Sequence, residues 1–588
     1  MYNTLMKRPN IVFILTDDQG YGDLGCHGNE IIKTPHIDRF YEDCIRMTDY
    51  HVGPTCAPTR AGLMTGHYAN STGVWHTIGG RSLLRANEWS LANALQESGY
   101  KTGLFGKWHL GDSYPYRPQD RGFDKVVTHG GGGISQTPDF WGNDYFDDTY
   151  KENGKNKEFK GYCTDVFFHE GIEFIKKNKN QPFLCFIPTN APHSPFNVEE
   201  KYRTLYSEKV PSPRDRFYGM ITNLDENFGT LRSTLQELCL EENTILIFMT
   251  DNGTAAGCQL DHEGQLVGGF NAGMRGKKCS PYEGGHRVPF FIRWPEGNLS
   301  GGKDFNSLCA NVDFMPTLLD LCSISVSDEH RFHGKSLAPY LNGTLVDPED
   351  RAIVTDSQRV TRPEKWKDSA VMLKHWRLIN GRELYDLKKD PAQKKDLHAE
   401  NKEVVAKLRE EYELWWDLVS SNFEEEIPLY IDPKKTTTLN THDWRNEDCS
   451  CAWNQAMIRE GLKCNGYYEI FVEKAGIYQV SLRRWPNETR HGISKSIDPD
   501  QDIEWNHESI DEGDSNHYSG SKALDIRSAK LEIGPMKWEK KVDGEKDQVN
   551  FEVHLNRGLG RLKSSFSGPE IELGAYYVVI HPIGNLNT

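Results

Sequence analysis

Two pairs of oxygen-bearing side chains stand far apart in the 588-residue chain, and each pair follows an apolar stretch. The first pair is Asp17 and Asp18, and the second is Asp251 and Asn252. Adjacent carboxylates are costly to bury without a cation, and a donor set made only of oxygen suits Ca²⁺ or Mg²⁺ rather than zinc. One such pair alone would fit a helix N-cap or a turn. Two similar pairs favour one shared site for a hard metal ion.

Basic side chains that could bind an anion also follow apolar segments. Lys107 and His109 are two residues apart at the end of a predicted strand, so their side chains point to the same side. A lone histidine is usually structural, but His193 ends a third strand of the same predicted sheet. The chain carries a formal charge of −16, from 85 acidic and 69 basic residues. An anionic substrate would therefore need a local group of cations.

The elements that must position these residues are short, buried strands. Residues 10–15, 182–187 and 244–250 show no alternation of apolar and polar side chains, which is typical of parallel strands covered on both faces. Open α/β sheets place their sites at the carboxyl ends of such strands. Residues 89–100 predict an amphipathic helix that stops at a glycine, and residues 216–240 show helical periodicity.

The residues that begin at Cys56 carry the most specific signal. The string Cys-Ala-Pro-Thr-Arg at residues 56–60 resembles the signature of the type I sulfatases, arylsulfatase-like members of the alkaline phosphatase superfamily. A cysteine near proline and arginine without further support would be interpreted as a buried thiol in a turn. Three more blocks resemble the same family: residues 106–111, 189–195 and 274–289. The resemblance covers about residues 7–420.

This resemblance implies a role for individual residues. In the family the cysteine is oxidised to formylglycine, which becomes a geminal diol in water, and Ca²⁺ is held beside it. The implied catalytic residues are Cys56, Arg60, Lys107, His109, His193 and Lys278. The implied metal ligands are Asp17, Asp18, Asp251 and Asn252 together with the modified Cys56, with Mg²⁺ as the less favoured ion. A formylglycine-generating enzyme is the implied maturation partner. The chain departs from the family pattern at Cys279, where glycine is common.

The implied reaction is hydrolysis of a sulfuric ester. The negative sulfate group repels nucleophiles, so the metal with Lys107 and Lys278 would neutralise the sulfonyl oxygens. One hydroxyl of the diol attacks sulfur, and His193 protonates the leaving oxygen. The second hydroxyl then loses its proton and expels sulfate, a route that an ordinary serine lacks. By the same resemblance, Arg60 and His109 hold the two hydroxyls.

Substrate choice is expected to depend on side chains around the leaving alcohol, and we predict a sulfated carbohydrate as the substrate. The candidates for substrate binding are His67, Trp75, His76 and Arg81, with the insertion 114–150. Arg81 could grip a further anionic group of a sugar, although pairing with a surface acid is the alternative. Two other functions stay open at this point: hydrolysis of phosphate or phosphonate esters within the same superfamily, and glycan binding without catalysis.

The expected fold is α/β, with a large mixed, mostly parallel sheet flanked by helices, followed by a small C-terminal α+β subdomain and an all-β, sandwich-like domain. Short strands with turn signals after Pro428 indicate the last of these. Its tryptophans Trp444, Trp453 and Trp485 are candidates for stacking on sugars or for core packing. The expected boundaries are a catalytic domain at 7–375, a small subdomain at 376–430 and an accessory domain at 431–588.

Composition excludes several other classes of protein. No apolar run approaches the ~20 residues that cross a bilayer, and the acidic balance argues against general binding to nucleic acid. Cys449, Cys451 and Cys464 fit no common zinc spacing, so they are interpreted as thiols or one disulfide. The glycine run 130–133 is interpreted as a flexible connection. Residues 1–9 contain no signal core, which predicts a cytoplasmic protein if Met1 is the native start and a periplasmic or secreted one if a leader was removed.

Overall fold

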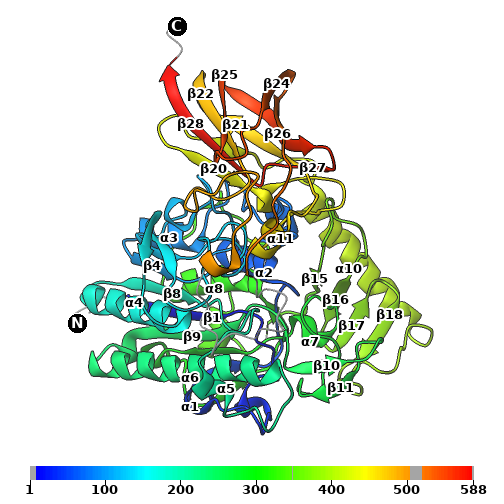
Figure 1. Cartoon of the computed structure of the whole chain (residues 1–588). Helices are drawn as coiled ribbons and strands as arrows, with labels where there is room; N and C mark the ends of the chain where they lie inside the picture. Colours follow the sequence, from blue (N-terminus) through cyan, green and yellow to red (C-terminus); the bar gives the residue numbers. More distant parts are fainter. Residues whose placement is uncertain (1–7, 347, 503–518, 586–588) are drawn as a thin grey trace.

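The computed structural model describes residues 8–346, 348–502 and 519–585. A layered body of helices and strands carries a small sheet at one side and a separate group of strands, from the end of the chain, above it (Figure 1). The start of the chain, on which the expectation about a leader depends, lies outside the described residues. No helix in the described ranges is long and apolar enough to cross a membrane.

The three apolar runs of the sequence form three neighbouring strands at the centre of a large sheet. β1 (Asn10–Thr16) pairs in parallel with β8 (Phe183–Pro188) on one side and with β9 (Thr244–Thr250) on the other. Every residue of these strands is buried, as expected for strands covered on both faces. The sheet runs in the order β13-β2-β12-β9-β1-β8-β4-β5-β6-β7. Its other strands are β2 (Ile45–Met47), β4 (Lys101–Phe105), β5 (Lys125–Thr128), β6 (Thr149–Glu152), β7 (Lys155–Glu158), β12 (Phe290–Arg293) and β13 (Lys303–Phe305).

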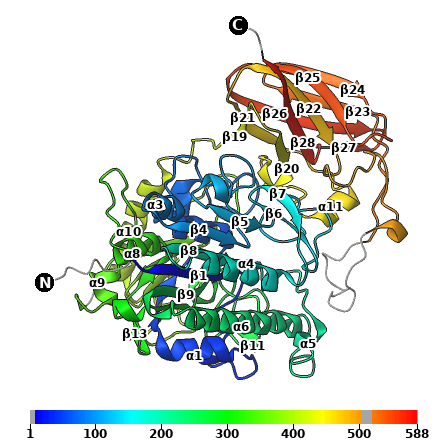
Figure 2. The same cartoon turned by 90° about the vertical axis from the view of Figure 1, so that its left-hand side faces the viewer.

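Helices cover both faces of this sheet, and the alternating side chains of β1 divide between two cores. Ile11 and Phe13 belong to the core under α2 (Cys56–Thr65), whereas Val12 and Ile14 belong to the core on the opposite face. α6 lies against α1 on that second face (Figure 2). The first face is covered by α2 with α3 (Leu91–Glu97) and α8 (Phe314–Leu321). The second face is covered by α1 (Pro35–Asp43), α4 (Cys163–Asn178) and α6 (Arg214–Glu237). The expected α/β class is confirmed.

Short elements complete the body. Two of the short helices lie next to segments that are described below. α7 follows the segment that contains Lys278, and α11 belongs to the C-terminal part of the chain. The short helices are α5 (Glu200–Arg203), α7 (Glu283–His286), α9 (Ala338–Leu341) and α11 (Gln455–Glu460). The two-stranded pairs are β3 (Tyr50–His51) with β14 (Cys309–Ala310), and β10 (Cys258–Leu260) with β11 (Leu266–Gly269).

A four-stranded antiparallel sheet and one long helix form the expected small α+β unit. Apolar residues on the sheet, such as Leu378, pack against Leu408 and Tyr412 of the helix. The elements are β15 (Ile353–Asp356), β16 (Ser369–Leu373), β17 (Trp376–Ile379), β18 (Glu383–Asp386) and α10 (Lys402–Ser420). Two of its strands precede the boundary expected at residue 375, so this unit takes its first strands from the segment assigned to the catalytic domain.

The end of the chain folds into two facing, mostly antiparallel layers, which Figure 2 shows above the α/β body. Alternate residues of β25 (Val549–Leu555) are buried, as in a sandwich. Trp444 and Trp485 are 1% and 0% exposed, so these two tryptophans pack in the core and are not available to sugars. The other strands are β19 (Leu429–Ile431), β20 (Thr437–Asn440), β21 (Tyr467–Val472), β22 (Gly476–Arg483), β23 (Ser528–Ile533), β24 (Met536–Lys541), β26 (Gly558–Gly568), β27 (Ile571–Leu573) and β28 (Tyr577–Asn585).

All thirteen cysteines of the chain lie in the described part of the protein, and all of them are free thiols. The interpretation of Cys449, Cys451 and Cys464 as ordinary thiols is therefore confirmed, and the alternative of one disulfide is not seen.

The sandwich shares its core with the α/β body. Leu83 and Tyr116 are buried within the same apolar cluster as the strands of the sandwich. The hydroxyl of Tyr577 donates to the carbonyl of Thr137 at 3.0 Å, and the Thr137 amide donates to the carbonyl of Trp453, also at 3.0 Å. The interface is therefore built as a domain core is built, with buried apolar side chains and satisfied polar groups.

We predict that a chain truncated after residue 431 is unstable. Truncation exposes Leu83 and Tyr116, and each fully buried apolar side chain of this size contributes about 1.5–3 kcal/mol. Thermal unfolding should show a lower Tm or insoluble protein, whereas Leu559→Ala, at a position that is 74% exposed, should leave the Tm unchanged. A soluble truncated chain with the Tm of the full chain would show that the sandwich is an independent appendage.

Candidate active site

The register of β1 and β9 brings the two acidic pairs together. Thr16 lies opposite Thr250, so the residues that follow both strands leave the sheet at the same edge. The amide of Asp18 donates to Asp251 Oδ1 at 3.1 Å. Carboxylate oxygens of Asp17, Asp18 and Asp251 lie within 4.8 Å of one another, and all three side chains are buried. The structure thus places these predicted ligands in one cluster.

The cluster has the properties of a site for a hard cation. Asp17 Oδ1 and Asn252 Oδ1 are buried and accept no hydrogen bond from any described residue. The amide nitrogen of Asn252 donates to Asp18 Oδ1 at 2.9 Å, which leaves its own oxygen free. Burial raises the pKa of Asp251 to about 7, and the charge of Asp17 adds to this. Free buried oxygens and a carboxylate whose ionisation is costly both fit a divalent ion bound by oxygen ligands.

Each carboxylate of the cluster has its own cationic partner. Lys107 Nζ donates to Asp17 Oδ2 at 2.6 Å, and Lys278 Nζ donates to Asp18 Oδ2 at 2.6 Å. Arg60 Nη2 donates to Asp251 Oδ2 at 2.8 Å. Burial by itself raises the pKa of Asp18, but Lys278, His193 and Lys107 together hold that pKa below its usual range. This local set of cations is the one that an acidic protein needs in order to bind an anion.

Cys56 begins the helix α2 within reach of the same charges. It is 2% exposed, and burial raises the pKa of its thiol while the neighbouring Lys107 lowers it. The amide of Cys279 donates to the carbonyl of Pro54 at 2.9 Å, which ties the segment of Lys278 to the segment before the helix. Cys279 itself has a φ of 72°, a left-handed conformation that glycine adopts more readily than other residues. This explains why glycine suits the position.

His109 is held by two loops. Its Nε2 donates to the carbonyl of Thr77 at 2.9 Å, whereas its Nδ1 is buried without a hydrogen-bond partner among the described residues. Gly132 packs against the imidazole so closely that a Cβ there would lie 2.4 Å from a ring carbon. The glycine run 130–133 is buried throughout. Its interpretation as a flexible connection was therefore wrong: these glycines let backbone approach the histidine.

His193 points at the same cluster from the loop that follows a third strand, β8. Its Nδ1 donates to the carbonyl of Ser194 at 2.6 Å, so Nε2 is the nitrogen that faces Asp18, 3.7 Å from Oδ2. Burial and then the charge of Lys278 lower the pKa of His193 to about 3. A Cβ at Gly133 would lie 3.4 Å from His193 Nδ1, so the glycine run contacts both predicted histidines.

The predicted substrate residues do not all lie near this cluster. His67 follows the C-terminal end of α2, about 15 Å along the helix from Cys56. Both of its ring nitrogens are already bonded, Nδ1 to Glu88 Oε2 at 2.8 Å and Nε2 to the carbonyl of Arg331 at 2.8 Å. The structure therefore gives His67 a packing role, and we remove it from the substrate site.

Trp75 and Arg81 are also removed from the substrate site. Trp75 is 2% exposed, and the guanidinium of Arg81 lies 4.7 Å over its ring. Arg81 Nη1 donates to Glu426 Oε2 at 3.3 Å, so the alternative of pairing with an acid describes this arginine. His76, which precedes Thr77, is the one of the four that stays beside the catalytic loops.

Sequence reasoning missed the contribution of the C-terminal part of the chain to this region. The carbonyl of His442 accepts from the Gly80 amide at 2.9 Å, and the Gln455 amide donates to the carbonyl of Ser135 at 3.2 Å. These bonds reach the loops that hold His109 and His193. No local pattern marks His442 or Gln455, because their partners lie more than 300 residues earlier in the chain.

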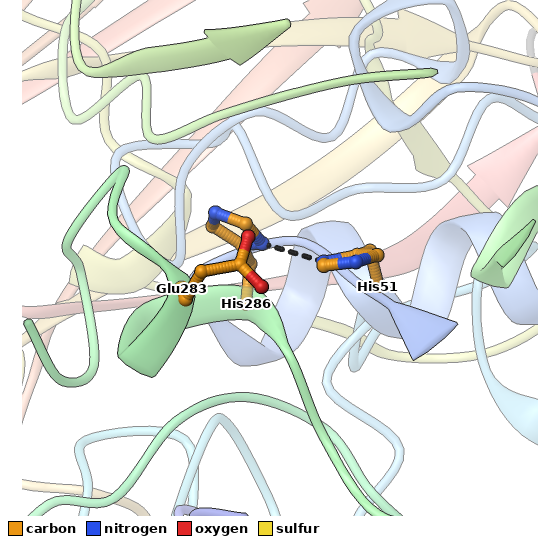
Figure 3. Close-up of side chains that lie close together, drawn as sticks. All are labelled: His51, Glu283 and His286. Atoms are coloured by element: carbon orange, nitrogen blue, oxygen red, sulfur yellow. Dashed lines mark hydrogen bonds between the residues drawn. The ribbon is translucent and has the colours of Figure 1, made fainter. Parts of the chain in front are cut away.

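A second buried cluster lies under the segment before Cys56, where His51 meets Glu283 and His286 (Figure 3). His286 Nε2 donates to the carbonyl of Pro281 at 3.0 Å, so its Nδ1 accepts the proton of His51 Nδ1 at 2.9 Å. His51 Nε2 lies 2.9 Å from Asp49 Oδ1, and this hydrogen-bonded network joins α7 to β3.

Comparisons with known proteins agree with this geometry. The model of the Sulfatase family matches residues 9–324, and that of the N-sulphoglucosamine sulphohydrolase C-terminal domain matches residues 276–415. The chain therefore belongs to the sulfatase family, and it is a sulfatase enzyme with the alkaline-phosphatase-like fold.

Individual relatives are similar to this chain over its catalytic part. Arylsulfatase G of Rattus norvegicus is 29% identical over 375 residues, covering 58% of this chain and 70% of the relative. N-acetylgalactosamine-6-sulfatase of Canis lupus familiaris is 30% identical over 365 residues, covering 58% of this chain and 67% of the relative. Among solved structures, Ps i-CgsB in complex with k-i-k-neocarrahexaose has a TM-score of 0.63 at 26% identity, covering 71% of this chain and 98% of that one. PsFucS1 sulfatase from Pseudoalteromonas sp. has a TM-score of 0.58 at 20% identity, covering 71% of this chain and 92% of that one. This similarity supports the assigned fold.

We predict that His67→Ala destabilises the protein without impairing catalysis. The substitution removes hydrogen bonds to Glu88 and to the carbonyl of Arg331, which should lower the free energy of unfolding by about 1–2 kcal/mol. Urea unfolding and kcat/KM on an aryl sulfate measure the two effects. A tenfold fall in kcat/KM at unchanged stability would return His67 to the substrate site.

Proposed function

We propose that this sulfatase removes sulfate from a sulfated oligo- or polysaccharide, using a formylglycine made from Cys56 and one bound Ca²⁺. The observation that carries the proposal is the position of Cys56 at the start of α2, among Lys107, Lys278 and the carboxylate cluster. A formylglycine-generating enzyme is then required as a partner during maturation. Hydrated formylglycine would supply the attacking hydroxyl, and Ca²⁺ would supply positive charge beside the sulfate.

The metal ligands in this proposal are Asp17, Asp18, Asp251 and Asn252, with the modified residue 56. Lys107 and Lys278 are bonded to the first two carboxylates at 2.6 Å, and an incoming sulfate group would share their ammonium groups. Fixed cations in a buried site stabilise developing negative charge without reorganisation.

Two histidines would handle the protons. His193 is the proposed acid, and its Nε2 is the atom that gives a proton to the leaving oxygen, because Nδ1 is committed to Ser194. The negative charge of a bound sulfate favours the imidazolium form, so His193 takes up its proton as substrate binds. His109 Nδ1 is the free nitrogen of the second histidine and would hold a hydroxyl of residue 56. Arg60 fixes Asp251 and, through Nη1, the carbonyl of Lys107 at 2.8 Å.

A saccharide is the proposed substrate because two of the similar proteins carry saccharide names. One relative is an N-acetylgalactosamine-6-sulfatase, and the structural neighbour of 26% identity is described with k-i-k-neocarrahexaose. An alcohol leaving group of this kind requires protonation, and the position of His193 meets that requirement.

We predict that Asp251→Ala abolishes metal binding. The change removes one carboxylate of the cluster and leaves too few hard oxygen ligands for Ca²⁺. Elemental analysis should find about one Ca²⁺ per wild-type chain and none in the variant, and added Ca²⁺ should raise the Tm of the wild type alone.

The control for this experiment is Asp225→Asn, a buried carboxylate that accepts from the amides of His36 and Ile37 outside the cluster. It should lower stability but keep the metal. Stoichiometric zinc, or metal retained by Asp251→Ala, would contradict the assignment.

We predict that the two kinds of leaving group respond differently to His193→Ala. Wild-type enzyme should release sulfate from both an activated aryl sulfate and members of a panel of sulfated oligosaccharides. Without His193, turnover of the oligosaccharide should fall by about 10²–10⁴-fold, because a sugar alkoxide needs a proton, whereas a nitrophenolate leaves with little help. Equal losses on both substrates would refute His193 as the acid. A wild-type enzyme that releases sulfate from no saccharide of the panel would refute the substrate class.

A further inference from the structure

The loop that follows β15 approaches the catalytic histidines from the small α+β unit. Trp75 Nε1 donates to the carbonyl of Val360 at 3.1 Å, so this loop is fastened to the segment that contains His76 and Thr77. The carbonyl of Thr77 in turn accepts from His109 at 2.9 Å. Two hydrogen bonds and one short segment therefore connect the loop to the catalytic site.

A cleft of about 500 Å³ opens along this loop. One wall is formed by residues 359–364, and the other is formed by residues 447–449 from the C-terminal part of the chain. The hydroxyl of Thr361 lies 3.0 Å from the carbonyls of both Asn446 and Glu447, so the two walls are held together at this point. The volume is sufficient for a saccharide unit.

Arg359 differs from the other arginines of this region. Arg81 is paired with Glu426, and Arg362 Nη1 donates to Glu424 Oε1 at 3.1 Å. Arg359 is exposed in the cleft and makes no hydrogen bond or ion pair with any residue that the structure describes. A free guanidinium presents a planar set of donors that matches a carboxylate or a sulfate.

His76 offers a second free donor, and the charge of Arg359 acts on its ring. The Thr77 amide donates to His76 Nδ1 at 2.6 Å, so a neutral ring carries its proton on Nε2. Burial and then the charge of Arg359 lower the pKa of His76 to about 4, which keeps the ring neutral near pH 7. Nε2 has no hydrogen-bond partner within the described ranges. An uncharged N–H donor within the electrostatic range of a free guanidinium suits a sugar that carries hydroxyls and an anionic group.

Acidic side chains on the opposite wall limit how much negative charge a ligand of the cleft can carry. Glu447 is exposed there and Asp448 accepts from the Ser450 amide at 3.0 Å. These carboxylates repel a ligand that is anionic over its whole surface, but they accept hydrogen bonds from hydroxyls. The mixed charge therefore suits one anionic substituent on an otherwise hydroxylated ring.

We propose that this cleft is the subsite for the leaving saccharide, in which Arg359 binds a second anionic group of the substrate and the C-terminal loop 447–449 accepts its hydroxyls. The inference rests on the proposed function, because it names the part of a sulfated saccharide that lies beyond the scissile sulfate. It also gives Arg359 the anion-binding role that the sequence analysis considered for Arg81, with pairing to a surface acid as the alternative.

The test compares Arg359→Gln with wild type on three substrates: a sulfated disaccharide with a second carboxylate or sulfate, the same disaccharide without it, and an aryl sulfate. Loss of a charge-assisted contact should lower kcat/KM on the first substrate by about 10- to 100-fold. The other two should change less than about twofold. The preference of the wild type for the doubly charged substrate should also weaken as salt is added.

Arg382→Gln is the matched control, because Arg382 is an exposed arginine of the same small α+β unit but does not line the cleft. It should leave all three substrates unchanged. Three outcomes would overturn the subsite but not the proposed function. They are equal effects of the two variants, equal losses on all substrates, and no loss on any saccharide that the wild type hydrolyses. A wild type that hydrolyses aryl sulfate and no saccharide would overturn the proposed substrate class, and the subsite with it.

Discussion

Burial of three carboxylates beside one another is the constraint on which the rest of this structure depends. Asp17, Asp18 and Asp251 are removed from water at one edge of a sheet, where like charges repel strongly unless cations balance them. The parallel register of β1 and β9 forces the acids together. The fold must therefore bring Lys107 and Lys278, with a third cation from α2, to the same place, and each of these comes from a different segment of the chain.

The elements around the cluster follow from this arrangement. The start of α2 places Cys56 among the charges, and the buried network of His51 and His286 anchors the segment before it (Figure 3). Glycines 132 and 133 allow a loop to pass against two imidazoles, where any side chain would collide or crowd. The C-terminal part of the chain packs against the outer side of these loops. It therefore contacts the segments that hold the two histidines of the site.

The sequence predicted the parts of the site that depend on local pattern. Apolar runs without alternation identified β1, β8 and β9, and the acids that follow two of them identified the cluster. His67 and Arg81 were misplaced because their types suit substrate binding, whereas their roles are decided by Glu88 and Glu426, which no nearby pattern reveals. The cleft at Arg359 was missed for the same physical reason: its two walls come from segments nearly 90 residues apart and meet only in the folded chain. Division of the chain into catalytic, small and accessory domains stays a prediction in its boundaries.

The central claim is that residue 56 acts as a formylglycine within this ring of paired charges. Peptide mass spectrometry of residue 56, on enzyme fractions that differ in activity per chain, tests it most directly. Our account predicts that the fraction of chains with formylglycine rises in proportion to kcat, and that chains with an unmodified thiol are folded but inactive. Full activity in a fraction that contains only unmodified Cys56 would contradict it.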